Sequence, residues 1–225
     1  MRRPLAVFLL TVTTLVAVTR DARADELKNQ LTADQLRLVE TGRDVVLTDP
    51  VDGNPWPRAR IYRIVRASPE EVTAVFFDYD GATSFVPSLL QSNITHRIDA
   101  KTMDVDYKVD VPILPDESYT CRNSLRPIDE GAYRIDWKLL KATTTRASVG
   151  CLRVEPYKDR AILCYENFVT PGSKMAGLLV NQAIDQMRET VRALALQVEK
   201  SSTKRTVELT RQVDQLRSAL QEQSP

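Results

Sequence analysis

The 225-residue sequence has a single histidine, His96, and only three cysteines. One histidine leaves no spare base for a catalytic triad and argues against a metal site built from histidines. No two cysteines have the C-x-x-C spacing, so neither a zinc knuckle nor a thioredoxin-type redox motif is supported. We therefore expect His96 to be structural, and we expect no metal or other cofactor.

The chain also lacks an excess of charge of either sign. Its 31 Lys and Arg residues against 30 Asp and Glu residues give a net charge of +1. Nucleic-acid-binding domains normally carry a basic excess, so we expect no nucleic-acid partner. Hydrophobic residues make up 43% of the chain and charged residues 27%, which is ordinary globular composition with length enough for one sizeable core.

The N-terminal apolar run is too short for a typical membrane span. Arg2 and Arg3 precede an apolar run of about 14 residues, Leu5 to Val18, and Ala22-Arg23-Ala24 has the small-x-small pattern of a cleavage site. A membrane-spanning helix needs roughly 20 apolar residues. We therefore expect a cleaved signal peptide over residues 1–24 and a secreted or periplasmic protein, with an uncleaved anchor as the alternative.

Export would bring the three cysteines, Cys121, Cys151 and Cys164, into an oxidising compartment. A hairpin that pairs Glu155 with Arg160 places Cys151 opposite Cys164. These two cysteines then either form a cross-strand disulfide or remain buried thiols. Cys121 is expected to stay unpaired because it would lie two strands from Cys151, roughly 10 Å away.

Capping boxes and alternating hydrophobicity predict the helices and strands between residues 32 and 169. Thr32 to Gln35 and Ser68 to Glu71 form capping boxes for helices that end near Glu40 and Phe77. Strands are expected at 44–48 and 58–66. From Leu89 to Phe168 the pattern predicts six strands at hairpin spacing, which favours a meandering antiparallel sheet. Their expected ranges are 90–99, 102–111, 117–126, 132–141, 146–155 and 160–169.

After Pro171-Gly172 the hydrophobic period changes from 2 to 3.6, which predicts a long amphipathic helix. The apolar stripe of this helix comprises Ala176, Leu179, Val180, Ala183, Met187, Val191, Leu194 and Val198. Residues 201–225 are polar with sparse leucines and could extend the helix or form a short coiled coil. We expect a solvated tail instead.

Three stretches resemble the START-like superfamily, also called SRPBCC: ASPEEVTAVFFDYDGATSFVPSLLQS, TMDVDYKVDVPILPDESYTCRN and VTPGSKMAGLLVNQAIDQMRETVRAL. The resemblance covers about residues 41–200. It implies an α+β helix-grip fold, in which a curved antiparallel sheet of about six to seven strands grips a long C-terminal helix and leaves a cavity between them. Asp116-Glu117 stands where many START-type domains carry an arginine-aspartate pair. The expected division is a signal peptide (1–24), an N-terminal helix and strand (25–57), the START-like domain (58–200) and the tail (201–225).

Hairpin arithmetic predicts the inward face of the sheet by pairing Cys121 with Trp137 and Ile135 with Cys151. A register slip of one residue would exchange the two faces. The face is largely apolar with a few polar points, which suits either an amphiphile site or a filled core. The expected cavity-lining residues are Val105, Tyr107, Tyr119, Asn123, Tyr133, Ile135, Trp137, Val149, Arg153, Glu166 and Phe168 on the sheet and Leu179, Ala183 and Met187 on the helix.

The leading hypothesis is an exported, non-enzymatic protein that binds and transfers a hydrophobic ligand such as a lipid, a sterol-like molecule or an isoprenoid, with transient membrane contact. Glu166 would then anchor a ligand hydroxyl or amine, or simply reach solvent at a strand end. Arg153 could meet a lipid phosphate or an acidic neighbour.

Two alternatives remain. One is an enzyme of the polyketide cyclase or aromatase type, for which Glu166 with Tyr107 or Tyr133 are the acid/base candidates. The other is a structural or interaction protein whose side chains fill the cavity. The oligomeric state stays open.

Overall fold

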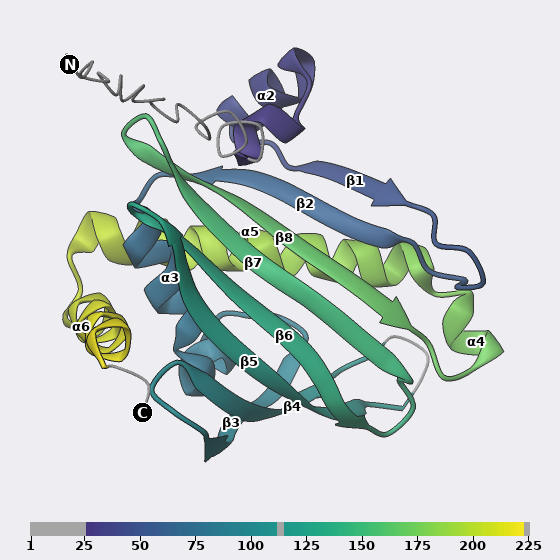
Figure 1. Cartoon of the computed structure of the whole chain (residues 1–225). Coiled ribbons are helices and arrows are strands. Elements are labelled where there is room, and N and C mark those ends of the chain that lie inside the picture. Colours follow the sequence, from purple (N-terminus) through teal and green to yellow (C-terminus); the bar gives the residue numbers. More distant parts are fainter. Residues whose placement is uncertain (1–25, 112–114, 223–225) are drawn as a thin grey trace, which may run out of the picture.

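A computed structural model describes residues 26–111 and 115–222 and contains an eight-stranded antiparallel sheet with the strand order β1-β2-β8-β7-β6-β5-β4-β3 (Figure 1). The predicted signal peptide lies outside the described residues. The strands are β1 Val45–Asp49, β2 Arg58–Val65, β3 Leu89–Arg97, β4 Thr102–Val109, β5 Glu117–Asp129, β6 Ala132–Ala142, β7 Ala147–Tyr157 and β8 Arg160–Thr170. The α+β helix-grip prediction is confirmed, with eight strands instead of six to seven.

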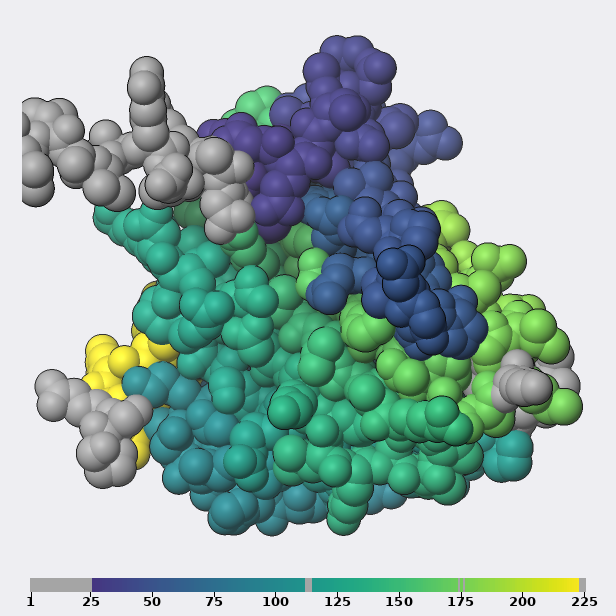
Figure 2. All heavy atoms as spheres, turned by 45° about the vertical axis from the view of Figure 1, so that its right-hand side comes forward, coloured from purple at the N-terminus to yellow at the C-terminus, as the bar shows by residue number. Residues whose placement is uncertain are grey.

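Helices cover both faces of this sheet, but unequally. The helical elements are η1 Leu27–Gln30, α2 Ala33–Glu40, α3 Pro69–Phe77, η2 Tyr79–Ser84, α4 Lys174–Gly177, α5 Val180–Lys204 and α6 Val207–Gln221. The long helix α5 and the shorter α3 lie on the concave face of the sheet (Figure 1). On the convex face, η1 and α2 cover one end of the strands, as Figure 2 shows.

Both predicted capping boxes are present. In the first, Gln35 N donates to Thr32 Oγ1 at 3.3 Å, and Thr32 N donates to Gln35 Oε1 at 2.9 Å. In the second, Glu71 N donates to Ser68 Oγ at 3.2 Å, and Ser68 N donates to Glu71 Oε2 at 2.8 Å. Each box satisfies backbone donors that the first helical turn would leave free, so α2 and α3 begin where the sequence predicts.

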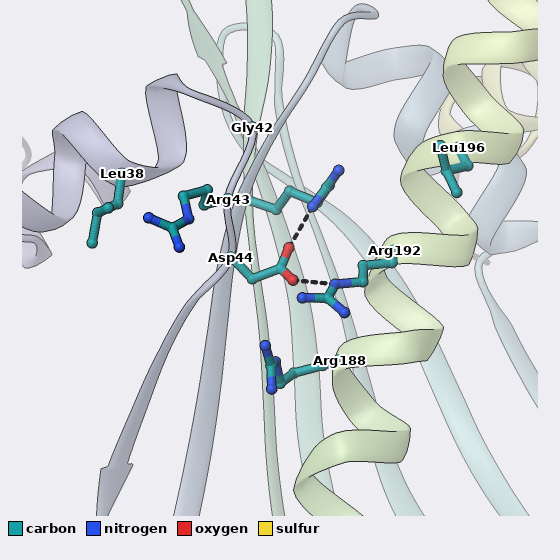
Figure 3. A pocket seen from close by; sticks show the side chains of 8 residues that line it. Leu38, Gly42, Arg43, Asp44, Arg188, Arg192 and Leu196 are labelled. Carbon is teal, nitrogen blue, oxygen red and sulfur yellow. Dashed lines mark hydrogen bonds and ion pairs between the residues drawn. The ribbon is translucent and has the colours of Figure 1, made fainter.

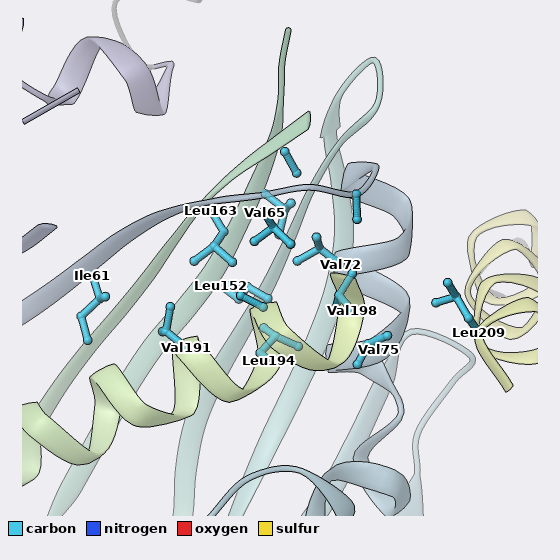
Figure 4. Packing of buried hydrophobic residues seen from close by; sticks show 14 of the residues in the cluster. Ile61, Val65, Val72, Val75, Leu152, Leu163, Val191, Leu194, Val198 and Leu209 are labelled. Carbon is cyan, nitrogen blue, oxygen red and sulfur yellow. The ribbon is translucent and has the colours of Figure 1, made fainter. Parts of the chain in front are cut away.

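The main core lies between the concave face and the second half of α5 (Figure 4). Val191, Leu194 and Val198 on α5 are 0 to 1% exposed. They pack with Leu152, Leu163 and Val65 of the sheet and with Val72 and Val75 of α3. The 3.6-residue stripe read from the sequence therefore forms the core here.

The expectation of a solvated tail after residue 200 is wrong. The helix α5 runs to Lys204, Arg205 takes a left-handed conformation with φ 47°, and Thr206 caps α6 by accepting from Leu209 N at 3.2 Å. Leu216 of α6 is fully buried and shares a hydrophobic cluster with Ala74 and Phe77 of α3. A sparse leucine spacing is enough for α6 because α3 presents a second apolar face for it to cover.

The predicted strand register is wrong in two places. Cys121 faces Leu139 and not Trp137, a slip of two residues that keeps each side chain on its predicted face. Ile135 faces Leu152, not Cys151, which is a slip of one residue. The slip places the whole predicted inward set of β7 and β8 on the convex face. Its physical cause is the fit between Trp137 and Gly150, which face each other. A Cβ atom at Gly150 would lie 2.4 Å from the indole ring, so this position must be a glycine.

Of the two alternatives for Cys151 and Cys164, the structure contains the buried thiols and not the disulfide. Cys151 faces Glu166 and Cys164 faces Arg153, and Cys121, Cys151 and Cys164 are all buried free thiols. Burial raises the pKa of Cys121 and Cys164 to about 12 and that of Cys151 to about 11. At neutral pH they are therefore protonated and act as small apolar side chains.

Candidate functional site

A cluster of aromatic side chains lies on the concave face, packed against or within the main core. It comprises Tyr107 on β4, Tyr119 on β5, Trp137 on β6, Tyr165 on β8 and Phe76 on α3. We call these five residues the aromatic cluster. Its members come from four strands and one helix, and they meet because the strands alternate their side chains between the two faces of the sheet.

The rings of the aromatic cluster form two contacting groups, one of Tyr107 and Tyr119 and one of Phe76, Trp137 and Tyr165. The centroids of Tyr107 and Tyr119 are 5.2 Å apart, and those of Trp137 and Tyr165 are 4.9 Å apart. The ring of Phe76 lies 6.1 Å from Trp137 and 6.4 Å from Tyr165. These separations are those of favourable aromatic pairs, so the rings form a rigid wall without needing a ligand to order them.

The three tyrosine hydroxyls of this wall have no hydrogen-bond partner among the described residues. Burial raises the pKa of Tyr107, Tyr119 and Tyr165 well above the ordinary value, so all three stay protonated. None of the three hydroxyls forms a hydrogen bond with the described part of the chain, yet each residue keeps some accessible surface. The three hydroxyls are not among the buried polar atoms that lack a partner, so they keep contact with solvent. Each of the three hydroxyls can therefore donate one hydrogen bond to a bound ligand.

The two halves of α5 pack differently. Val191, Leu194, Ala195 and Val198 in the second half are at most 1% exposed. Met187, one turn before Val191, is only partly buried, and so is Ala183 one turn earlier. Because Ala183, Met187 and Val191 follow one another at four-residue spacing, they lie on the same side of the helix. The apolar stripe is therefore closely packed only from Val191 onward.

The loop between β6 and β7 is held in place by the buried carboxylate of Glu117. Glu117, at the start of β5, is 7% exposed and accepts hydrogen bonds from Thr144 N at 3.0 Å, Thr145 N at 2.9 Å and Thr144 Oγ1 at 2.5 Å. Burial alone would raise the pKa of Glu117, but these hydrogen bonds outweigh it and the pKa lies below its ordinary value.

The ionised form of Glu117 should therefore contribute pH-dependent stability. Its pKa is lower in the folded than in the unfolded chain, so the contribution is complete above the unfolded carboxyl value of about 4.3 and is lost as the pH falls through the folded value. Glu117→Gln is expected to lose about 1 to 2 kcal/mol at pH 7. Urea denaturation of both proteins at pH 7 and pH 3 should show a smaller difference at pH 3. Glu130→Gln, at an exposed turn, is the control, and a pH-independent difference for Glu117→Gln would contradict the assignment.

Seven of the predicted sheet residues do lie on the concave face: Val105, Tyr107, Tyr119, Asn123, Tyr133, Ile135 and Trp137. Val105 and Ile135 are fully buried in the hydrophobic cluster that also contains Leu216 of α6. Asn123 is 3% exposed and donates to Cys121 O at 3.2 Å. On the helix, Leu179, Ala183 and Met187 are partly buried.

The other four predicted residues, Val149, Arg153, Glu166 and Phe168, lie on the convex face because of the register slip. Glu166 forms an ion pair with Arg58 at 2.8 Å, and the Arg58 guanidinium stacks over Phe168 at 5.4 Å. Arg153 pairs with Glu155 at 2.6 Å. Glu166 is therefore on the opposite side of the sheet from Tyr107 and Tyr133, and this acid/base set is not assembled.

Sequence reasoning missed Phe76, Tyr165 and Asn167. Tyr165 and Asn167 follow Leu163 at two-residue spacing, so the correct β7–β8 turn would have placed them on the inward face. Asn167 Oδ1 accepts from Trp137 Nε1 at 3.3 Å and holds the indole in place. Phe76 had no such signal, because the orientation of α3 over the sheet is not encoded in its hydrophobic period.

Two further searches of the described residues concern metal ligands and membrane-spanning helices. No three His, Cys, Asp or Glu side chains gather there as ligands of a metal ion. None of the described helices combines the length and the apolar composition that a membrane crossing needs.

The curved sheet and the helix α5 that it grips form a helix-grip fold, and comparison with solved structures finds the same START-like fold. A STAR-related lipid transfer protein from Xanthomonas axonopodis superposes with a TM-score of 0.62 at 16% identity, over 69% of this chain and 93% of its own. Human STARD10 gives 0.56 at 11% identity, over 75% and 76%. The Zhui aromatase/cyclase from Streptomyces sp. R1128 gives 0.53 at 16% identity, over 64% and 94%.

These similarities establish the fold alone. Their names include a lipid transfer protein and an aromatase/cyclase, so the fold carries both binding and enzymatic functions in those proteins. No protein-family model matches the sequence, and no curated protein matches it either.

Proposed function

We propose that the protein binds a hydrophobic ligand, such as a lipid, a sterol-like molecule or an isoprenoid, between the aromatic cluster and the first half of α5. The observation that carries the proposal is the set of three partly exposed tyrosines on the concave face whose hydroxyls have no hydrogen-bond partner among the described residues. Apolar walls would bury the ligand body at roughly 0.8 kcal/mol per methylene, and the hydroxyls would hydrogen-bond its polar end.

Ala183→Trp tests this proposal. Ala183 lies on the loosely packed part of the stripe, so an indole there would occupy space that the ligand needs. The variant should stay folded while uptake of a fluorescent fatty acid falls about tenfold or more, since the insertion fills the site rather than the core. Uptake is measured by fluorescence titration and folding by thermal unfolding.

Gln182→Trp is the matched control, since it adds the same indole to an exposed position of the same helical turn. It should change neither uptake nor stability. A wild type that takes up no amphiphile, together with an Ala183→Trp variant that is strongly destabilised, would show that the space is a filled core. That result would contradict the proposed hydrophobic ligand site.

A second candidate function is an enzyme of the aromatase/cyclase type. The same tyrosine hydroxyls support it, because burial keeps them protonated and able to donate to a developing oxyanion. Turnover of a bound aromatic precursor would distinguish it from reversible binding. Loading a polyketone mimic and following product by mass spectrometry is the direct assay.

Membrane contact and export are further parts of the proposal. Met175 on α4 and Leu178 before α5 are 62% and 80% exposed, and such apolar side chains suit transient contact with a bilayer during ligand transfer. Export rests on the N-terminal sequence pattern alone.

A further inference from the structure

A pocket rich in arginine lies between α5, strand β2 and the segment that leads from α2 into the edge strand β1, and none of its lining residues belongs to the aromatic cluster (Figure 3). Its volume is about 590 Å³. It is lined by Leu38, Gly42, Arg43, Asp44, Arg63, Arg188, Arg192 and Leu196. We call it the arginine pocket. Three separate parts of the fold build it: the end of α2 with the turn that follows it, strand β2 and one face of α5.

The charges of the arginine pocket do not balance. Asp44 is its only lining carboxylate, and this side chain has no exposed surface. Asp44 accepts from Arg63 Nη1 at 2.5 Å and from Arg192 Nε at 2.5 Å, so one carboxylate serves two guanidinium groups. With Arg43 and Arg188 the lining carries four positive charges against one negative charge.

The two remaining guanidinium groups are not neutralised within the pocket. Arg188 pairs at 3.1 Å with Asp185, one turn earlier on α5, and this carboxylate is 66% exposed and screened by water. Arg43 forms no ion pair with the described residues. In addition, the buried Nε groups of Arg63 and Arg188 donate to no acceptor in the described chain. Buried donors of this kind call for an acceptor that the protein itself does not supply.

We propose that the arginine pocket binds a phosphate group, either free phosphate or the headgroup of a phospholipid. The residues that line the pocket carry three more positive charges than negative ones. A doubly charged phosphate therefore suits the pocket better than a singly charged carboxylate does. The guanidinium fork matches phosphate oxygens with paired hydrogen bonds. The site is separate from the proposed hydrophobic site, so either can fail without the other.

Calorimetric titration of the full chain with inorganic phosphate at low salt tests the proposal. Arg188→Gln removes one guanidinium and leaves both contacts of Asp44 in place. It should weaken phosphate binding about tenfold or more, as expected for the loss of a charge-assisted hydrogen bond. Lys200→Gln, at an exposed position of the same helix, removes the same charge outside the pocket and should change the affinity less than about twofold.

Vesicle binding distinguishes the two sources of the phosphate group. If the ligand is a lipid headgroup, vesicles that contain phosphatidic acid should bind the wild type but not Arg188→Gln. Pure phosphatidylcholine vesicles should bind neither, and inorganic phosphate should compete. If the ligand is free phosphate, calorimetry shows binding and the vesicles show no dependence on Arg188.

Two results would overturn the proposal: no binding of phosphate or phosphatidic acid by the wild type, or equal losses in Arg188→Gln and Lys200→Gln. Should Arg188→Gln fold poorly in a thermal melt, Arg43→Gln replaces it. Arg43 lines the same pocket and supports no ion pair among the described residues, so its removal tests binding without disturbing the fold.

Discussion

Asp44→Ala is expected to lower the free energy of unfolding by about 3 kcal/mol, the lower end of the range for breaking a buried ion pair. The carboxylate joins Arg63 on β2 to Arg192 on α5 and so ties the sheet edge to the gripped helix. Its removal leaves the Arg63 guanidinium, which is only 15% exposed, without its ion-pair partner. Arg192 is 47% exposed and regains water, which keeps the loss at the lower end. Urea denaturation measures the change.

Asp49→Ala is the matched control for this prediction. Asp49 pairs with Arg60 at 2.7 Å on the same two strands, but it is 54% exposed. Exposed pairs of this kind contribute about 0 to 1 kcal/mol. Equal losses for the two variants would mean that Asp44 does not connect the sheet to α5.

Gly150→Ala should be as damaging, with a loss of about 3 kcal/mol or more from overpacking. The added Cβ would lie 2.3 Å from Glu166 O and 2.4 Å from Trp137 Cζ2. Neither a backbone carbonyl in a central strand nor a buried indole moves away easily. Trp137 must shift, so the native tryptophan emission should change as well as the urea midpoint. Ligand uptake should fall with it, because Trp137 is part of the aromatic wall.

Gly177→Ala provides the comparison for Gly150→Ala. Its Cβ would meet Pro55 at 3.5 Å, an ordinary contact, and the residue lies in α4. Alanine is favoured over glycine in a helix, so stability should stay the same or rise by up to about 1 kcal/mol. If Gly150→Ala were equally harmless, the close approach of Trp137 to β7 would not exist.

Local sequence patterns predicted the positions of the elements well. Ser68 and Glu71 fixed the start of α3, and two-residue alternation located each strand of the meander to within a few residues. These features depend on neighbours in the chain, so they are visible in the sequence. The aromatic residues of β4, β5 and β6 were assigned to the correct face for the same reason.

The register could not be predicted in this way, and the register decides which side chains of β7 and β8 face inward. Pro156 suggested a four-residue turn, but β7 continues through it and turns at Lys158, which has φ 57°. The fit of Trp137 over Gly150 sets the pairing of β6 with β7 and is a property of shape in three dimensions. The arginine pocket was missed because Asp44 and Arg192 are distant in sequence and meet only in the fold.

The second apolar face of α3 has an evolutionary consequence. The helix-grip fold needs only the sheet and α5, and α5 ends at Lys204. Nevertheless, Ala74 and Phe77 of α3 are buried in the cluster that contains Leu216 of α6. While α6 is present, selection has no reason to keep that face of α3 polar, and apolar substitutions there can accumulate. Once they have done so, loss of α6 would leave α3 with an exposed apolar surface. An appended helix of this kind thereby becomes difficult to lose, even if it contributes nothing to the ligand site.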